Sequence, residues 1–585
     1  MPQLRTRMWL TLPVLLLFVL YWPGLTTWFY QDDFGWLNLR HDVHSAADLA
    51  AALFAPKAHG NMRPLGENAY WLGLSAVFGA DPLPFHLATF LTQSASLILL
   101  GAIARRLFRS QVAAVAAPLL WLVNIGLAPA MAWSSIYNQV LSAFFFLLAF
   151  YFLLRAIETG RRAHSLAHWG AFVLGLGALE INVVYPALAV LYAWFYARDW
   201  VRPVLPMFAV SAASVAAHFY FAPPSHAGVY APRVDAALFP TLYAYWRWAL
   251  GPMPQALAIA MLAAVAVLIV WGIRRGDYLP LVSAAWFLFP LLPYLPLPEH
   301  KMDYYLAVPA TGIALLGSCA LGAMRTSRLP ARAATIACIA WYAAVSVPAS
   351  ASAVRWQHAR GEKVEDLVLG VEEARAAAPG KIILLDGIDT DLFWSGIADL
   401  PFRARGVPGV YLAPNRETPI DAPPELLSKY TLPAAIARTL FAAGSAAVYR
   451  FDGSLLHDET LRAAARWTED EPRFVNLGDP VFAAFVGAGW EPPADACRRM
   501  KGPASLRIGA PRHAGEALYL GIFETHEVRP GVTVNGVACP LTVSHRDNDL
   551  TEFRAALPPP SLEWKQLEVS IRNSRPLLFG YAEVR

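Results

Sequence analysis

The sequence predicts a polytopic α-helical membrane protein of about eleven spans, followed by two domains outside the cytoplasm. Of the 585 residues 56% are hydrophobic and 15% are charged, and the mean hydropathy is +0.40. Long uncharged stretches are confined to residues 1–354, and arginine clusters separate them. We therefore predict a membrane part at 1–354, an α/β domain at 355–489 and a β-sandwich at 490–585.

The uncharged or nearly uncharged stretches are long enough to cross a bilayer, which takes about 20 apolar residues in a helix. They lie at 8–30, 83–104, 111–131, 135–154, 203–222, 252–273, 279–298, 302–324 and 333–353. Residues 166–198 hold either one long helix or two short ones. The first stretch is not followed by a small-residue cleavage site, so we expect it to be retained as a helix rather than removed as a signal peptide.

The arginine clusters decide how residues 166–198 fold. Cytoplasmic loops of membrane proteins are enriched in Lys and Arg. The clusters that begin at Arg5, Arg105, Arg155, Arg198, Arg274 and Arg325 all face the cytoplasm only if 166–198 is a hairpin of two short helices. The N-terminus is then inside and everything after about residue 354 is outside. The net charge of +4 follows from this topology, so we predict no nucleic-acid partner.

The cysteines indicate no metal site. The chain has four, and none lies in a CxxC or Cys/His ligand pattern. Cys497 and Cys539 fall in the predicted external region, where a disulfide is permitted, and the sequence leaves that pairing open.

Polar residues gather in the predicted outer loops. Asp32 and Asp33 directly follow the first span, and residues 31–82, 223–250 and 299–303 form loops on the same face. An ionisable residue at a membrane helix end is a functional candidate. The alternatives are that an aspartate caps a helix beginning at Phe34, and that the other charged side chains contact solvent or lipid headgroups.

Two short motifs carry a resemblance to a known family. Residues 62–65 read Met-Arg-Pro-Leu, and residues 78–86 read Phe-Gly-Ala-Asp-Pro-Leu-Pro-Phe-His. Together with the acidic pair after the first span, they resemble polytopic glycosyltransferases of the GT-C fold, such as protein O-mannosyltransferases and lipid A aminoarabinose transferases. The resemblance covers about residues 8–351. The chain departs from the family pattern at Tyr304, where a cation is expected, and Lys301 lies three residues earlier on the same helical face.

The resemblance implies transfer of a sugar from a polyprenyl-phosphate donor to a hydroxyl of a glycan, lipid or protein acceptor, at the outer face of a bacterial inner membrane. It implies Asp32 as general base, with Asp33 as a supporting acid or a contact to the sugar. Single displacement would invert the anomeric centre, whereas double displacement would need a covalent nucleophile, for which Asp33 is the spare carboxylate. Arg63, His300 and Lys301 are then candidates for the donor phosphate, and Glu180, Tyr304 and Tyr305 for the substrate cavity. No cofactor is assigned; the carboxylate pair leaves a divalent metal ion open, although two ligands are too few to predict one.

The last third of the sequence carries no spanning segment. Apolar strands at 381–387 and 446–451 alternate with helical stretches, as in a small α/β domain, and Asp386, Asp389 and Asp391 are interpreted as capping and loop residues. From about 490, short strands with turns predict a β-sandwich that resembles carbohydrate-binding modules. Trp490, Trp564 and Tyr519 could stack on sugars there, and core packing is the favoured interpretation.

Two other functions compete with transfer. A transporter or flippase of a lipid-linked sugar would also need many spans, but the inverted repeats common in transporters are not evident in the sequence. A non-catalytic membrane scaffold would tolerate replacement of Asp32. Polar residues concentrated at one interface favour the enzyme.

Overall fold

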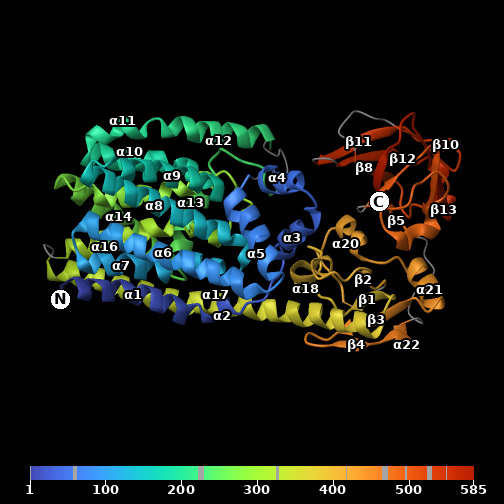
Figure 1. The fold of residues 1–585 in the computed structure, drawn as a ribbon, viewed down its shortest axis with the longest axis horizontal. Coiled ribbons are helices and arrows are strands. Elements are labelled where there is room, and N and C mark those ends of the chain that lie inside the picture. The colour runs from blue at the N-terminus through green and yellow to red at the C-terminus, as the bar shows by residue number, and fades with distance from the viewer. Residues whose placement is uncertain are drawn as a thin grey trace. The chain divides into compact units, whose positions relative to one another are not determined.

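The chain forms two compact units, Met1–Val364 and Glu365–Arg585. The computed structural model describes residues 2–56, 62–221, 229–324, 328–414, 416, 418–463, 472–494, 497–523, 530–547 and 550–585. Figure 1 shows coiled helices throughout the first unit and strands only in the second. Arg325, and residues 223–228 of the predicted loop 223–250, lie outside the described residues.

The first unit is built from helices joined by short turns. In chain order they are α1 (Pro2–Leu20), α2 (Trp22–Leu25), α3 (Asp33–Asn38), α4 (Ala46–Phe54), α5 (Tyr70–Phe78), α6 (Pro82–Phe108), α7 (Gln111–Leu122), α8 (Tyr137–Thr159), α9 (Arg162–Ala178), α10 (Tyr185–Tyr196), α11 (Val201–Val204), α12 (Met207–Phe221), α13 (Leu238–Leu250), α14 (Gln255–Arg274), α15 (Leu279–Leu288), α16 (Ala310–Ala323) and α17 (Leu329–Ala377). The last residues of α17, after Val364, belong to the second unit.

Several helices have the length and apolar composition of membrane spans. Among the described residues there are five, or up to six if Gln111–Leu122 and Ile125–Met131, bent by 62°, form one span. These helices are those of a multi-pass membrane protein, while the count of about eleven stays a prediction. The structure confirms two short helices in 166–198, because α9 and α10 are separated by a 3-10 helix at Glu180–Val184.

The second unit begins with a small α/β fold. Strands β1 (Ile382–Asp386), β2 (Val410–Leu412) and β3 (Ala446–Phe451) are parallel, and β4 (Leu456–Asp458) pairs antiparallel with β3 in the order β2-β1-β3-β4. Its helices are α18 (Thr390–Gly396), α19 (Pro401–Ala404), α20 (Pro424–Tyr430), α21 (Ala434–Ala442) and α22 (Thr460–Ala463). Asp389 caps α18 by accepting from the Leu392 amide, as expected for this acidic stretch.

Two antiparallel sheets form the rest of the second unit. One has the order β10-β9-β13-β7 and the other β11-β12-β8-β14-β5, with β6 also paired to β14. The strands are β5 (Phe474–Asn476), β6 (Arg498–Arg499), β7 (Ala504–Gly509), β8 (Ala517–Phe523), β9 (Gly531–Val534), β10 (Val537–Ala538), β11 (Leu541–Asp547), β12 (Leu550–Ala556), β13 (Gln566–Arg572) and β14 (Leu578–Val584). Strand β5 joins this sandwich although it precedes residue 490, where the domain boundary is predicted.

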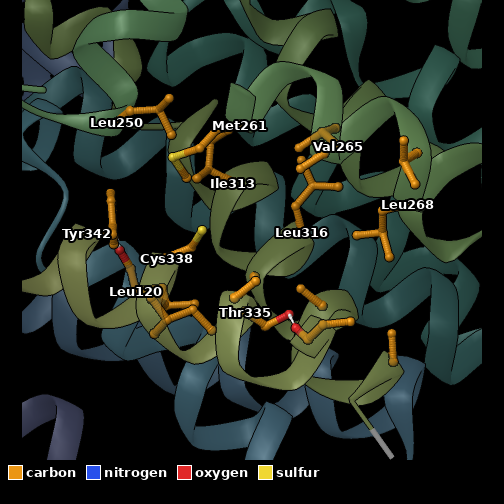
Figure 2. A pocket seen from close by; sticks show the side chains of 18 of the residues that line it. Leu120, Leu250, Met261, Val265, Leu268, Ile313, Leu316, Thr335, Cys338 and Tyr342 are labelled. Atoms are coloured by element: carbon orange, nitrogen blue, oxygen red, sulfur yellow. Dashed lines mark hydrogen bonds between the residues drawn. The ribbon is translucent and has the colours of Figure 1, made fainter. Parts of the chain in front are cut away.

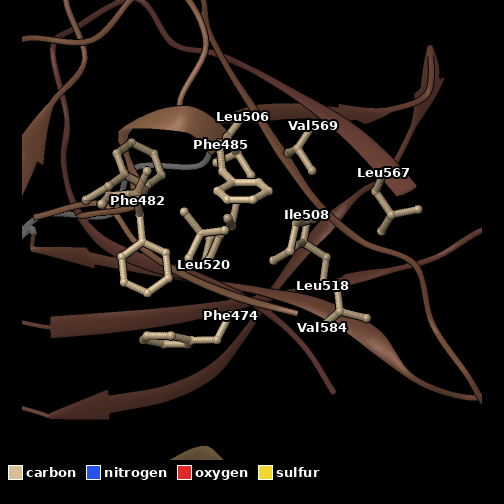
Figure 3. Close-up of a cluster of buried hydrophobic side chains, with 14 of the residues drawn as sticks. Phe474, Phe482, Phe485, Leu506, Ile508, Leu518, Leu520, Leu567, Val569 and Val584 are labelled. Atoms are coloured by element: carbon tan, nitrogen blue, oxygen red, sulfur yellow. The ribbon is translucent and has the colours of Figure 1, made fainter. Parts of the chain in front are cut away.

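The two sheets share one hydrophobic core (Figure 3). Leu506 and Val569 of the first sheet meet Leu518 and Val584 of the second. Trp490 and Trp564 pack against this cluster, which agrees with the core-packing interpretation. All four cysteines are free, so Cys497 and Cys539 do not form the disulfide that the sequence left open.

Candidate active site

The acidic pair lies at a turn with an uncommon backbone conformation. Gln31 has a φ of 56°, in the left-handed region that side chains other than Gly, Asn and Asp rarely adopt. Asp32 precedes α3 but makes no side-chain capping hydrogen bond, so the capping interpretation does not hold for it. Non-glycine residues held in this region cluster at functional sites.

The two aspartates differ in their surroundings. Asp33 is 1% exposed, its Oδ1 accepts from the Ser135 hydroxyl at 2.5 Å, and its Oδ2 accepts from the Tyr30 amide at 3.3 Å. Asp32 is exposed, and no other described residue donates a hydrogen bond to its carboxyl, which lies against its own backbone amide. Asp33 is therefore held in place, whereas Asp32 is available to a ligand.

Loss of water dominates the electrostatics of both carboxyls: it is complete at Asp33, whereas at Asp32 the surrounding protein removes part of the water and the residue still reaches solvent. Loss of solvent around Asp32 raises its pKa; Glu67 raises it further and Arg360 opposes the rise. Burial raises the pKa of Asp33 to about 8, against the lowering effect of its bonds from Ser135 and Tyr30. Asp33 therefore holds its proton near neutral pH, whereas the raised pKa of Asp32 makes its carboxylate a stronger proton acceptor than an ordinary one.

Arg63 lies between two glutamates. Its Nε donates to both oxygens of Glu180 at 3.0 and 2.8 Å, and its Nη1 donates to Glu67 at 2.5 Å. Asn138 donates to the same Glu67 oxygen at 2.6 Å. Burial alone would lower the pKa of Arg63, but the charges of Glu180 and Glu67 raise it above its usual value.

Local backbone geometry brings Arg63 to Glu180. Arg63 precedes a π-helix at Pro64–Ala69, and Glu180 follows the end of α9. A Cβ at Gly66 would lie 2.2 Å from the Ala178 carbonyl oxygen, so only glycine permits this approach. The glycine thus allows the ion pair between segments far apart in the sequence.

Aromatic rings connect the acidic pair to residues 294–305. Tyr30 stacks on Trp133 with centroids 5.8 Å apart, and Trp133 meets Tyr304 at 6.1 Å. Tyr305 stacks on Tyr294 at 3.9 Å. Asp32 acts electrostatically on Tyr304, and Arg63 and Glu180 act on Tyr305. Asp32, Arg63, Glu180, Tyr304 and Tyr305, predicted from the sequence, therefore lie in one site.

The two remaining predicted cations differ in their placement. His300 is 9% exposed, with its ring 4.2 Å from that of Tyr230 and 6.1 Å from that of Tyr305, so it joins the site. The Lys301 ammonium donates to the Pro298 carbonyl within its own loop. This contact does not connect Lys301 to the other site residues, and its phosphate role stays a prediction.

The structure adds residues that sequence reasoning missed. Arg360 of α17 donates to the Gln31 side chain at 3.0 Å and lies 5.6 Å over the ring of Tyr30. The sequence placed it in the external domain, and the structure places it in the first unit. Glu67, one helical turn after Arg63, was detectable because residues four apart on a helix are neighbours.

Several buried polar atoms in this region have no partner among the described residues. They are Trp133 Nε1 and Ser134 Oγ just before α8, and Asn138 Oδ1 and Gln139 Oε1 in its first turn. Each unpaired buried polar atom costs about 1–3 kcal/mol, so such a concentration indicates groups that a polar ligand can satisfy. No cluster of three or more His, Cys, Asp or Glu side chains fit for a metal ion occurs in the described part of the chain.

An apolar cavity of about 530 Å³ lies elsewhere in the first unit. Figure 2 shows side chains such as Leu250, Met261, Ile313, Leu316 and Cys338 turned toward it from α13, α14, α16 and α17. Its lining contains no charged residue, so it is suited to a hydrocarbon chain.

No protein-family profile and no curated protein matches the chain. Among solved structures, ArnT from Cupriavidus metallidurans in the apo state is 12% identical over 76% of this chain and 93% of its own, with a TM-score of 0.41. ArnT bound to undecaprenyl phosphate is 13% identical over 79% and 95%, with a TM-score of 0.42. The arabinosyltransferase EmbB from Mycobacterium smegmatis is 12% identical over 98% of this chain and 64% of its own, with a TM-score of 0.30.

Proposed function

We propose that the chain is a multi-pass membrane glycosyltransferase. It moves a sugar from a polyprenyl-phosphate donor to an acceptor hydroxyl on the extracytoplasmic face of a bacterial inner membrane, with inversion of the anomeric centre. The observation that carries the proposal is the exposed carboxylate of Asp32 beside the Arg63–Glu67–Glu180 cluster and unpartnered buried polar atoms.

Asp32 is the general base. No other described residue donates a hydrogen bond to its carboxylate, and its raised pKa strengthens it as a proton acceptor. A positioned base contributes about 10²–10⁴-fold to the rate. Asp33 is already engaged by Ser135 and Tyr30, which suits a supporting acid that fixes the turn rather than a group that attacks the sugar.

The leaving phosphate needs cationic donors. Arg63 donates from Nε to Glu180 and from Nη1 to Glu67, whereas its Nη2 makes no hydrogen bond to the described residues. A guanidinium group so oriented can donate to a phosphate oxygen without leaving its carboxylate partners. His300 and Lys301 are the further phosphate candidates, and Arg360 joins them because it lies beside Gln31.

The donor's hydrocarbon chain requires an apolar surface. The uncharged cavity lined from α13, α14, α16 and α17 supplies one within the first unit. The glutamates and the orphaned amide and hydroxyl groups near Arg63 are suited to sugar hydroxyls, because these can donate and accept in the same place. The acceptor, a glycan, lipid or protein, is set by surfaces outside this cluster.

The test is a reconstitution of the full chain into vesicles with labelled polyprenyl-phosphate sugars and a panel of hydroxyl acceptors. Transfer of label to an acceptor is the expected result. Movement of intact labelled lipid between leaflets without transfer would establish the flippase alternative instead. If no donor in the panel gave either transfer of label or movement of lipid, the result would favour the non-catalytic scaffold.

A further inference from the structure

We propose that a groove between α1, α7 and α17 binds one membrane phospholipid with a net negative headgroup, its phosphate on Arg355 and an acyl chain along the groove. The groove has a volume of about 500 Å³. It shares no lining residue with the cavity of Figure 2 and none with the candidate active site. The inference therefore does not depend on the proposed function.

One face of each helix lines the groove. The lining residues at the N-terminal end of the chain recur three or four positions apart, a spacing that places them on one face of a helix. They are Leu16, Val19 and Leu20 of α1 and Pro23 of α2. Along α17 the lining residues are Val347, Ala351 and Arg355, which are four residues apart. The lining is thus an apolar stripe that ends in a single cation.

The groove lies where α7 stops. This helix contains Pro118, ends at Leu122 and is followed by a segment bent away by 62°. The carbonyls left at its end are satisfied from the sides: Tyr21 donates to the Leu122 oxygen at 2.6 Å and Ser350 to the Val123 oxygen at 3.1 Å. Tyr21 and Ser350 are both fully buried, so the frame of the groove is fixed by packing and hydrogen bonds.

The charge of Arg355 and its level in the membrane indicate which ligand the groove binds. Arg355 is the only charged residue that lines the groove, it is exposed, and it makes no ion pair with the described residues. It directly follows the apolar stretch 333–353, so it lies where that span meets the headgroup region. Trp22 and Trp356, 61% and 57% exposed, are the aromatic residues typical of this level.

A phospholipid supplies both complementary parts in the right order. Its phosphate matches the planar donors of a guanidinium group, and its acyl chain continues into hydrocarbon, where the apolar stripe lies. A free phosphate would leave the stripe uncovered, and a neutral or zwitterionic headgroup would leave the charge of Arg355 uncompensated. An anionic phospholipid satisfies both.

The test uses the full chain in vesicles of equal parts phosphatidylglycerol and phosphatidylcholine. After extraction in mild detergent, native mass spectrometry counts the lipids that remain bound. We expect one retained phosphatidylglycerol on the wild-type chain, and about tenfold lower retention for Arg355→Gln, because a charge-assisted contact is lost. Ala351→Phe, which fills the groove, should lower retention as well.

The matched control is Ser352→Phe, which adds the same bulk on α17 at an exposed position outside the groove. It should retain phosphatidylglycerol as the wild type does. Equal retention by Arg355→Gln, equal retention of both phospholipids, or no retained phospholipid on the wild type would each overturn the proposal. If Ala351→Phe does not fold, as circular dichroism would show, the Arg355→Gln comparison decides alone.

Discussion

Two ionic clusters in this protein have the same composition and different surroundings. In the first unit Arg63 pairs with Glu67 and Glu180; in the second, Arg585 pairs with Glu552 at 2.8 Å and Glu583 at 3.0 Å. The arginines are similarly covered, with side chains 20% and 28% exposed. One arginine between two glutamates is therefore not by itself a sign of function.

The difference lies in what else the glutamates contact. In the second unit Tyr581 donates to Glu552, Ser428 donates to Glu583, and the Arg585 guanidinium lies 4.0 Å over the ring of Tyr519. Tyr519 therefore carries a cation on its ring rather than an open face for a sugar. None of these six residues has a buried side-chain polar atom without a partner in the part of the chain described.

The Arg63 cluster, by contrast, has unpartnered polar atoms near it. Asn138 donates to Glu67 while its own Oδ1 has no partner, and the next residue, Gln139, has an orphaned Oε1. Unpaired buried hydrogen-bonding atoms, more than charge, therefore distinguish a candidate ligand site from an ion cluster that only stabilises the fold.

The largest expected effect separates the two clusters by activity. Arg63→Met should lower the rate of sugar transfer by at least about 100-fold, because it removes a cation held for the phosphate. Arg585→Met should leave the rate within about twofold. Initial rates in reconstituted vesicles measure both, and equal loss in the two variants would erase the proposed distinction.

Arg585→Met, which should leave the transfer rate almost unchanged, should instead destabilise the second unit. Arg585→Met leaves the largely buried Glu552 and Glu583 without their cation, at a cost of about 3 kcal/mol. Hydrogen exchange of β12 and β14 in the full chain should speed up accordingly. A matched change, Arg507→Met on β7 of the other sheet, should leave that exchange unchanged, since the Arg507 side chain is exposed.

Asp33 in the first unit predicts a pH dependence of stability. Its pKa is about 8 in the folded chain and near 3.8 when unfolded, so between about pH 4 and pH 8 the folded state holds the extra proton. Stability therefore falls as pH rises through this window. The apparent Tm of Asp33→Asn minus that of the wild type should increase from pH 4 to pH 8. A difference that is flat across the window would show that Asp33 is not buried as described.

The smallest expected effect concerns two residues with a left-handed backbone conformation, Gln31 and Asn535. Asn535, with a φ of 47°, suits this conformation and its Oδ1 accepts from the Glu568 amide at 2.6 Å. Asn535→Ala should cost about 1–2 kcal/mol. Gln31→Gly should change stability by less than about 0.5 kcal/mol, because relief of strain offsets the lost bond to Arg360. Thermal unfolding of each variant measures the contrast, and a larger cost at Gln31 would reverse it.

Much of the fold and part of the site could be predicted from the sequence. Uncharged stretches indicate membrane helices, and the Glu180 break in residues 166–198 follows from charge placement. Asp32, Glu180 and Tyr305 were detectable as polar or aromatic residues beside apolar stretches, and Arg63 was detectable as part of the Met-Arg-Pro-Leu motif.

Other features depend on tertiary structure that the pattern does not contain. Arg360 joins the site because α17 continues past the predicted span, and helix length beyond an apolar stretch carries no hydropathy signal. The pairing of Arg63 with two carboxylates depends on the close approach that Gly66 permits. Strand β5 joins the sandwich by pairing with β14 across more than a hundred residues, a distance over which sequence periodicity gives no information.

The central claim is that Asp32 removes the proton from the acceptor. The most direct measurement is the single-turnover transfer rate of Asp32→Asn beside that of Asp48→Asn, a partly exposed aspartate in the first turn of α4 that accepts from the His44 amide and is no member of the candidate site. We predict that Asp32→Asn loses at least about 100-fold in rate with donor binding intact, and that Asp48→Asn matches the wild type. A wild-type rate for Asp32→Asn would contradict the account.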